Sequence, residues 1–270
     1  MFSLGWCKGF EKDTIIGVTG IAEKVARDPE GYKELQSQVD DVSRFVGQQF
    51  EALSQPIYQE VKRQNNAIGA PGLTPLFTSA PGDFTCHLSC TFNNFSKKPH
   101  TDRDSLPYTF VTWLPIDKTT GDLIEDDLDG YGSEFVFPRH GFGIDFSGFK
   151  GVVECAWRAR HIHHLTGPST TPDSSPHAQL GYSVQLPTKT KEVIQKNQKG
   201  DYKKDPKKKH WKVCDMRVIL DNSQTYPRPK KRQQNDDKPS SENNNDNKPL
   251  SKRPSKKCQR RQPSNKRQRH

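Results

Sequence analysis

An alternation of apolar and polar residues between positions 84 and 93 constrains the fold of this chain more than any other feature. The apolar residues are Phe84, Cys86, Leu88, Cys90 and Phe92, and between them stand Thr85, His87, Ser89, Thr91 and Asn93. Because successive side chains of a β-strand point to opposite faces of a sheet, this period predicts a strand with two chemically different faces. Further strand-like runs follow at 108–114, 133–137, 152–157 and 180–186. Many short strands without a helical period between them predict an antiparallel sandwich or barrel.

A helical period precedes the strands. Asp28 followed by Pro29 predicts a helix start, since aspartate is a good cap and proline is favoured at the first helical position. Apolar residues then recur every three or four positions, at Tyr32, Leu35, Val39, Val42, Val46, Phe50 and Leu53. This stripe predicts one amphipathic helix that lasts until Pro56 and a second, short helix through Ile57 and Val61. We expect both to pack against the outside of the barrel as support.

Composition separates the C-terminal end from the rest of the chain. The 270 residues include 42 Lys and Arg and 32 Asp and Glu, a net charge of +10. Positions 230–270 hold 14 of the basic and 4 of the acidic residues, which is the whole excess, so positions 1–229 are neutral. From Arg228 onward there is almost no large apolar residue. Such a segment cannot bury a core, and we expect it to be disordered when unbound.

These patterns divide the chain into three parts. We expect an N-terminal helical region over 1–69, a β-rich domain over 70–198 and a basic, low-complexity tail over 199–270. The six cysteines form no C-x-x-C pair and nothing at the N-terminus reads as a cleavable signal, which indicates an intracellular, reduced protein. No apolar run approaches the roughly 18–20 residues that span a bilayer, so we expect no membrane partner.

A candidate metal site begins at His100-Thr101-Asp102. Residues two apart on extended backbone project to the same face, so the imidazole and the carboxylate point together. With a second histidine they would form the facial triad of non-haem Fe(II), which leaves coordination positions open. The cluster His161-Ile162-His163-His164 can supply that histidine, and spacing alone does not choose among its members. The alternatives are a solvated strand-end pair, or a zinc site with Cys155 whose spacing matches no standard zinc pattern.

Several motifs occur together in one order. Thr91-Phe92-Asn93-Asn94-Phe95 precedes Lys98-Pro99-His100-Thr101-Asp102. After them come Tyr108-Thr109-Phe110, Ser133-Glu134-Phe135-Val136-Phe137-Pro138, Asp145-Phe146-Ser147-Gly148-Phe149, Val153-Glu154-Cys155-Ala156-Trp157 and His164-Leu165-Thr166-x-Pro168-Ser169. Over roughly residues 70–190 this series resembles the fungal Tet-like 2-oxoglutarate/Fe(II) oxygenases of the Tet/J-binding protein family. Colinearity of so many segments is more specific than any single motif.

The resemblance implies a fold, a reaction and a set of ligands. The fold would be α+β, with a double-stranded β-helix, or jelly-roll, core over 70–198, supporting N-terminal helices and a disordered basic tail. The metal ligands would be His100, Asp102 and His164, the last because it directly precedes the Leu-Thr-x-Pro-Ser stretch. Fe(II), 2-oxoglutarate and O2 would then serve a dioxygenase. Tet-like relatives oxidise the methyl group of 5-methylcytosine, which implies methylated DNA as the partner and a base flipped out of the stack.

One departure from the family concerns the cosubstrate. Where the family has an arginine that pairs with the distal carboxylate of 2-oxoglutarate, the run from His177 to Ser183 has Gln179. An amide cannot replace the charge of a guanidinium, so affinity should fall unless another cation substitutes. Candidates for cosubstrate binding are therefore Gln179, Ser183, Arg158 and Arg160, with Lys97 and Lys98 as further possible substitutes.

The tail carries spaced basic clusters. They comprise Lys230, Lys231, Arg232, Lys252, Arg253, Lys256, Lys257, Arg260 and Arg261, followed by 266–269. Such clusters fit phosphate contacts and equally fit recognition by the nuclear import machinery, so we expect a nuclear protein. A merely solubilising tail is the alternative. The rival to the enzyme hypothesis is a catalytically degenerate Tet-like protein that acts as a nucleic-acid-binding or mobile-element accessory factor.

Overall fold

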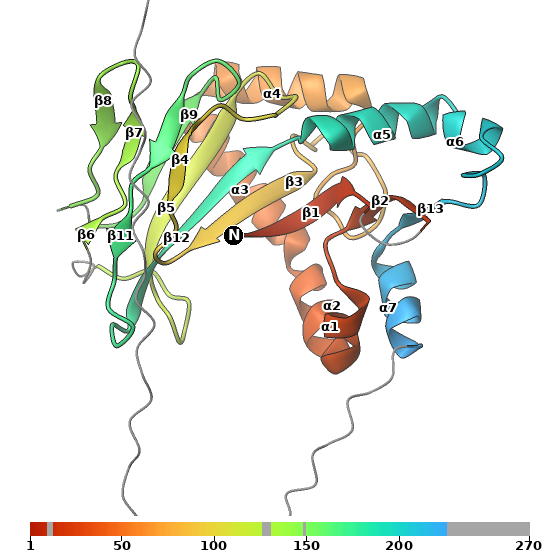
Figure 1. Ribbon diagram of the computed structural model, residues 1–270, viewed down its shortest axis with the longest axis horizontal. Coiled ribbons are helices and arrows are strands. Elements are labelled where there is room, and N and C mark those ends of the chain that lie inside the picture. The colour runs from red at the N-terminus through yellow and green to blue at the C-terminus, as the bar shows by residue number, and fades with distance from the viewer. Residues whose placement is uncertain (10–12, 126–130, 148–149, 226–270) are drawn as a thin grey trace, which may run out of the picture. The chain divides into compact units, whose positions relative to one another are not determined.

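The computed structural model describes residues 1–9, 13–125, 131–147 and 150–225, and its largest element is a seven-stranded sheet. In sheet order the strands are β13 (Lys212–Cys214), β2 (Thr14–Val18), β1 (Phe2–Lys8), β3 (His87–Phe92), β12 (His177–Gln185), β5 (Thr109–Asp117) and β9 (Val153–Trp157). All neighbours are antiparallel except β13 and β2. Figure 1 shows this sheet with helices beside and behind it.

Two smaller sheets accompany it. One contains β4 (Lys97–His100), β10 (His164–Thr166), β7 (Phe135–Phe137) and β8 (Phe142–Ile144) in that order, and the other pairs β11 (Ser169–Thr170) with β6 (Tyr131–Gly132). The four-stranded sheet packs on the large one through an aromatic cluster that includes Trp113, Phe135 and Trp157. The result is a sheet-rich α+β arrangement consistent with the expected jelly-roll core.

Helices cover the other face of the large sheet. They are α1 (Ala22–Arg27), α2 (Pro29–Ser37), α3 (Val39–Leu53), α4 (Gln55–Ile68), α5 (Thr188–Gln198), α6 (Asp201–Lys204) and α7 (Met216–Gln224). Phe50 of α3 is fully buried and stacks on Phe110 of β5 with ring centroids 4.7 Å apart. The helices after Asp28 therefore support the sheet as predicted, and the Asp28 carboxylate accepts a hydrogen bond from the N–H of Gly31.

The single long helix expected between Asp28 and Pro56 is two helices. α2 ends at Ser37 and α3 begins at Val39. The Ser37 hydroxyl donates to the carbonyl oxygen of Glu34 at 2.7 Å, and the Gln38 N–H bonds back three residues to Leu35. Side-chain hydrogen bonds of this kind compete with the helical pattern, so the chain tightens and changes direction here.

The predicted strand over 84–92 is largely confirmed as β3, including its two faces. Leu88 and Cys90 are buried in the core on the helix side. Ser89, Thr91 and, just past the strand, Asn93 line a cavity between the sheets. The runs expected at 133–137 and 152–157 contain β7 and β9, and those expected at 108–114 and 180–186 contain most of β5 and β12.

Both ends of the described chain differ from the sequence prediction. Residues 2–8 and 14–18, expected to be helical, form β1 and β2, where Trp6 and Ile16 are fully buried. Long-range pairing of β1 with β3 fixes this strand, and local periodicity does not reveal such pairing. Residues 199–225, expected in the disordered tail, contain α6, β13 and α7. The remaining tail residues, 226–270, lie outside the described part.

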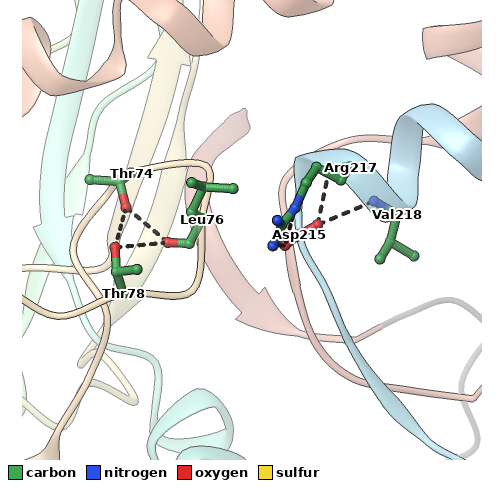
Figure 2. Close-up of polar contacts among 6 residues, drawn as sticks. All are labelled: Thr74, Leu76, Thr78, Asp215, Arg217 and Val218. Atoms are coloured by element: carbon green, nitrogen blue, oxygen red, sulfur yellow. Dashed lines mark hydrogen bonds and ion pairs between the residues drawn. The ribbon is translucent and has the colours of Figure 1, made fainter.

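The C-terminal segment meets the loop over residues 74–78 at the start of α7, and side-chain hydrogen bonds order both sides of this contact. The Asp215 carboxylate caps α7 by accepting from the N–H groups of Arg217 and Val218 at 3.0 and 3.2 Å. Nearby, the Thr74 hydroxyl donates to the carbonyl oxygen of Leu76 and lies 3.3 Å from the Thr78 hydroxyl, as Figure 2 shows. The loop and the helix meet where the Met216 N–H donates to the carbonyl oxygen of Pro75 at 3.1 Å. Within the described residues, no helix is both long and apolar enough to cross a bilayer.

His87 predicts a pH dependence of stability. It is 5% exposed, and burial lowers its pKa from 6.5 to about 4. The unfolded chain takes up a proton below about pH 6.5, whereas the folded protein does so only near pH 4. We therefore expect the free energy of unfolding to fall as the pH drops from 6.5 to 4, by up to about 3 kcal/mol. Urea titrations at several pH values should show this loss for the wild type and a smaller one for His87→Gln; equal pH slopes would contradict the assignment.

Candidate metal centre

The two histidines of the predicted site lie side by side on adjacent strands of the four-stranded sheet. His100 ends β4 and His164 begins β10, and their Cα atoms are partners in the antiparallel pairing of these strands. Asp102 follows β4, and its N–H donates to the carbonyl oxygen of Ala159 at 2.9 Å. Local strand geometry thus presents the first histidine and the carboxylate together, and strand pairing adds the second histidine.

The side-chain distances match what one cation requires. The Nε2 atoms of His100 and His164 lie 3.4 and 3.7 Å from Oδ1 of Asp102. Ligand atoms at about 2.1 Å from a cation and about 90° apart are separated by about 3 Å, so small side-chain movements suffice to coordinate a metal. All three ligand atoms lie within 4.8 Å of one another. His164 is buried, whereas the side chains of His100 and Asp102 keep partial access to solvent.

Backbone carbonyl groups orient both imidazoles. Nδ1 of His100 lies 2.8 Å from the carbonyl oxygen of Lys98, and Nδ1 of His164 lies 3.0 Å from that of Ile162. A carbonyl oxygen only accepts, so we assign the proton to Nδ1 in each ring, which leaves the Nε2 lone pair for a metal. The indole Nε1 of Trp157 also approaches Nδ1 of His164, at 3.3 Å, and we rank this contact below the shorter one to Ile162.

Buried Asp104 fixes the loop that carries Asp102. Its Oδ1 accepts hydrogen bonds from the N–H groups of Leu106 and Leu186, at 3.0 and 2.8 Å. Burial raises the pKa of this carboxyl group to about 6. The carboxylate thus ties the segment after β4 to the end of β12, on the large sheet, which anchors the ligand loop to both sheets.

The metal ligands open onto a cavity of about 230 Å³ between the two sheets. The residues that line it come from the large sheet (Ser89, Thr91, Thr109, Val111, Trp113, Trp157, Gln179, Gly181, Tyr182, Ser183 and Gln185), from the four-stranded sheet (Lys97, His100, Phe135, His164 and Thr166) and from Met1, Asn93, Phe95 and Asp102. One end therefore offers metal ligands and the remainder offers hydroxyl, amide and aromatic groups. A small polar molecule that coordinates the metal would extend along this cavity.

The structure separates the candidate cosubstrate residues. Gln179 and Ser183 line the cavity. Arg158 and Arg160 are exposed and do not, and the Arg158 guanidinium lies over the Tyr108 ring at 5.5 Å instead. Both arginines are therefore poor substitutes for a cosubstrate cation. The basic residues proposed at 230–261 lie outside the described part of the chain.

The competing histidines do not join the cluster. Within the described residues, the group that can hold a metal consists of His100, Asp102 and His164. His161 lies in an exposed turn, where its N–H donates to the carbonyl oxygen of Arg158, and His163 does not line the cavity. Cys155, on β9, packs against the aromatic cluster and is not a member of this ligand group, which argues against the zinc alternative.

Sequence reasoning missed most of the cavity wall. Trp157 was expected as a strand residue, yet its ring lies 5.1 Å from that of His164 and forms one side of the metal centre. Thr166 and Gln185 also line the cavity. The sequence feature that could have indicated this cavity is the polar face of the 84–93 alternation, because a polar face on a buried strand implies an enclosed polar space.

Two histidines and one carboxylate beside a cavity between two sheets match the ligand set of the non-haem iron oxygenase class of protein. Residues 1–169, more than half of the chain, match the family model of the Tet-like 2OG-Fe(II) oxygenase superfamily, and the chain belongs to that family. A comparison with curated proteins finds no match. The family match ends before β12, so Gln179 and Ser183 lie beyond it.

The family implies Fe(II), 2-oxoglutarate and O2, and the donor set fits the metal. Two neutral imidazoles with free Nε2 atoms and one carboxylate are the ligands that non-haem Fe(II) takes in such oxygenases. His100, Asp102 and His164 would hold the ion, and the adjoining cavity would hold the oxoacid. At the family level, the protein is a 2-oxoglutarate/Fe(II) dioxygenase.

Proposed function

We propose that this dioxygenase oxidises the methyl group of 5-methylcytosine in DNA. The observation that carries the enzyme assignment is the cluster of His100, Asp102 and His164 at an open cavity. When bound, Fe(II) and 2-oxoglutarate supply the oxidation of a C–H bond by O2. The chain's own part is to orient the ligands through backbone carbonyl groups and to exclude water from the inner end of the cavity with Trp113, Phe135 and Trp157.

The DNA substrate rests on the resemblance to Tet-like enzymes and on charge. Between positions 188 and 212 the chain has ten lysines and three acidic residues, an excess of seven positive charges. These positions, which we call the lysine ridge, run through α5 and α6 to the start of β13 (Figure 1). Eight of the lysines are exposed, and among the described residues Lys208 is the one of the ten that forms an ion pair, with Asp205. Such a surface suits a phosphate backbone.

The basic tail is a second observation that supports DNA binding. Its clusters also resemble signals for nuclear import. Its residues from Lys230 to Arg261 carry the clusters expected to bind phosphates or import factors. We accordingly propose a nuclear location and methylated DNA as the partner. The polymer and the base are the parts of this proposal that need a direct test.

The deciding experiment is nucleoside mass spectrometry of methylated duplex DNA after incubation with the protein, Fe(II), ascorbate and 2-oxoglutarate. We expect 5-hydroxymethylcytosine or more oxidised products with the unmodified protein and none with His100→Ala or Asp102→Ala. If no oxidised base forms although the protein is folded and loaded with iron, the 5-methylcytosine assignment fails.

The rival function, a degenerate accessory factor, predicts a different result. Gln179 in place of the expected arginine is the observation that favours it. Calorimetry with a redox-inert divalent metal should then show no binding of 2-oxoglutarate, whereas DNA binding persists. Binding of the oxoacid would exclude this alternative.

The lysine ridge makes a prediction about salt dependence. Lys203→Gln combined with Lys204→Gln should weaken DNA binding and reduce the slope of log affinity against log salt by about 0.9 for each lysine that contacts a phosphate. Fluorescence anisotropy at several salt concentrations measures both quantities. Lys24→Gln with Lys33→Gln, which removes the same charge from α1 and α2, is the control. An unchanged slope in the ridge variant, with loss only on deletion of 228–270, would assign DNA contact to the tail instead.

A further inference from the structure

The chemistry of 2-oxoglutarate sets a requirement that Gln179 alone cannot meet. The molecule has a 2-oxo acid group at one end, which suits a metal, and a second carboxylate at the other end. Placing that carboxylate in a protein cavity without a cation costs much of its hydration free energy. Some residue must therefore supply a positive charge, and its identification rests on the dioxygenase function given above.

Lys97 is the only lysine or arginine that lines the cavity in the described part of the chain. Lys98, the next residue, does not line it, and Arg158 and Arg160 lie elsewhere. None of the ion pairs among the described residues involves Lys97. Its ammonium group, on an exposed residue of β4, is therefore available to an anionic ligand.

Strand pairing places Lys97 at the end of the cavity away from the metal ligands. In the β4–β10 ladder, His100 is opposite His164, and Lys97 is opposite Thr166. Phe135 pairs with Thr166, and its ring spans from His164 and Trp157, at 5.6 and 5.1 Å, to Trp113, at 4.9 Å. On the large sheet, β5 runs from Thr109, which pairs with Trp157, through Val111 and Trp113 to Pro115, which pairs with Gln179. Lys97 and Gln179 thus lie toward the same end.

The spacing suits the ligand. Three residues of extended strand separate Lys97 from His100, a span of roughly 10 Å between Cα atoms. The carbon chain of 2-oxoglutarate extends for roughly 5 Å, as four C–C bonds of about 1.5 Å allow. A metal ion at one end and the flexible lysine side chain at the other therefore can contact the two ends of one molecule.

We propose that Lys97 binds the carboxylate of 2-oxoglutarate that is remote from the metal, with the Gln179 amide donating a neutral hydrogen bond to the same group. The cation comes from β4, the strand that also carries His100, and not from β12. Loss of the arginine at position 179 is then compatible with cosubstrate binding.

Calorimetry on the full-length protein loaded with Mn(II) tests this without turnover. Lys97→Ala should weaken 2-oxoglutarate binding about 10- to 100-fold, as expected for loss of a charge-assisted hydrogen bond. Binding of 2-oxobutanoate, which keeps the 2-oxo acid and lacks the second carboxylate, should be unchanged. Lys98→Ala is the matched control and should bind both acids like the wild type. Gln179→Arg added to Lys97→Ala should restore affinity for 2-oxoglutarate alone.

The two oxoacids separate the possible failures. If the wild type binds 2-oxoglutarate and Lys97→Ala binds it equally well, or loses affinity for both acids alike, the role of Lys97 is overturned and the oxygenase assignment stands. If the metal-loaded wild type binds neither acid, the proposed function itself fails, and the role of Lys97 with it. Because Lys97 is exposed, thermal melting of the variant should match that of the wild type.

Discussion

Replacing His164 with alanine should lower the affinity of the protein for Fe(II) or Mn(II) at least about 100-fold and abolish oxidation of any substrate. Disturbing a residue that only orients a metal ligand already costs about 10- to 100-fold in affinity, and removal of the ligand itself should exceed that. His164 is also the buried member of the triad, so its loss leaves Asp102 with His100 alone at a more open site. Metal titration by electron paramagnetic resonance of Mn(II) measures the effect directly.

His163→Ala is the control for this experiment. The residue adjoins His164 in the chain but neither belongs to the cluster nor lines the cavity. Its replacement should leave metal affinity unchanged. If the two variants lose metal equally, the second histidine has been assigned to the wrong member of the 161–164 cluster.

Phe50→Ala should destabilise the folded protein by about 3–5 kcal/mol, the range observed when a buried phenylalanine is truncated. The ring is fully buried, stacks on Phe110 and makes edge contacts with Tyr58 and Phe84. Its removal leaves a cavity between α3 and the large sheet that rigid neighbours fill only in part. Urea denaturation followed by circular dichroism should show a lower midpoint with an unchanged slope.

Phe45 provides a matched comparison on the same helix. It is 54% exposed, and Phe45→Ala should change the free energy of unfolding by no more than about 0.5 kcal/mol. A cost for Phe45→Ala as large as that for Phe50→Ala would show that the exposed side of α3 is also packed, against a partner or a second copy of the chain.

The sequence predicted the parts of this protein that depend on local order. The alternation around β3 and the His100-Thr101-Asp102 spacing each follow from strand geometry, which acts over a few residues. The choice of His164 over His161 and His163 came from resemblance, and the structure supports it through the pairing of β10 with β4. Spacing alone could not make that choice, because any of the three histidines can follow a strand.

What the sequence did not predict depends on distant contacts. β1 has no clear period, and its pairing with β3 joins residues more than 80 positions apart. The segment after Lys199 is rich in lysine and poor in apolar residues, yet a few anchors such as Ile219, which is 1% exposed, fold it onto the sheet. The net charge also hid a basic surface. Residues 1–229 are neutral in sum, but this sum combines seven excess positive charges on the lysine ridge with an equal negative excess elsewhere.

The pairing of His100 with His164 has a mechanical consequence. These residues belong to strands of only four and three residues, and 64 positions of chain separate them. A metal held by both would act as a cross-link that closes this long loop and clamps the edge strand β4 to its neighbour. The unfolded chain has no preformed site, so the ion binds the folded chain alone. A free metal concentration of about 1,000 times the dissociation constant would then add about 4 kcal/mol to the free energy of unfolding. The metal centre would thereby stabilise the fold as well as serve the reaction, and the iron supply would affect how much of the protein is folded.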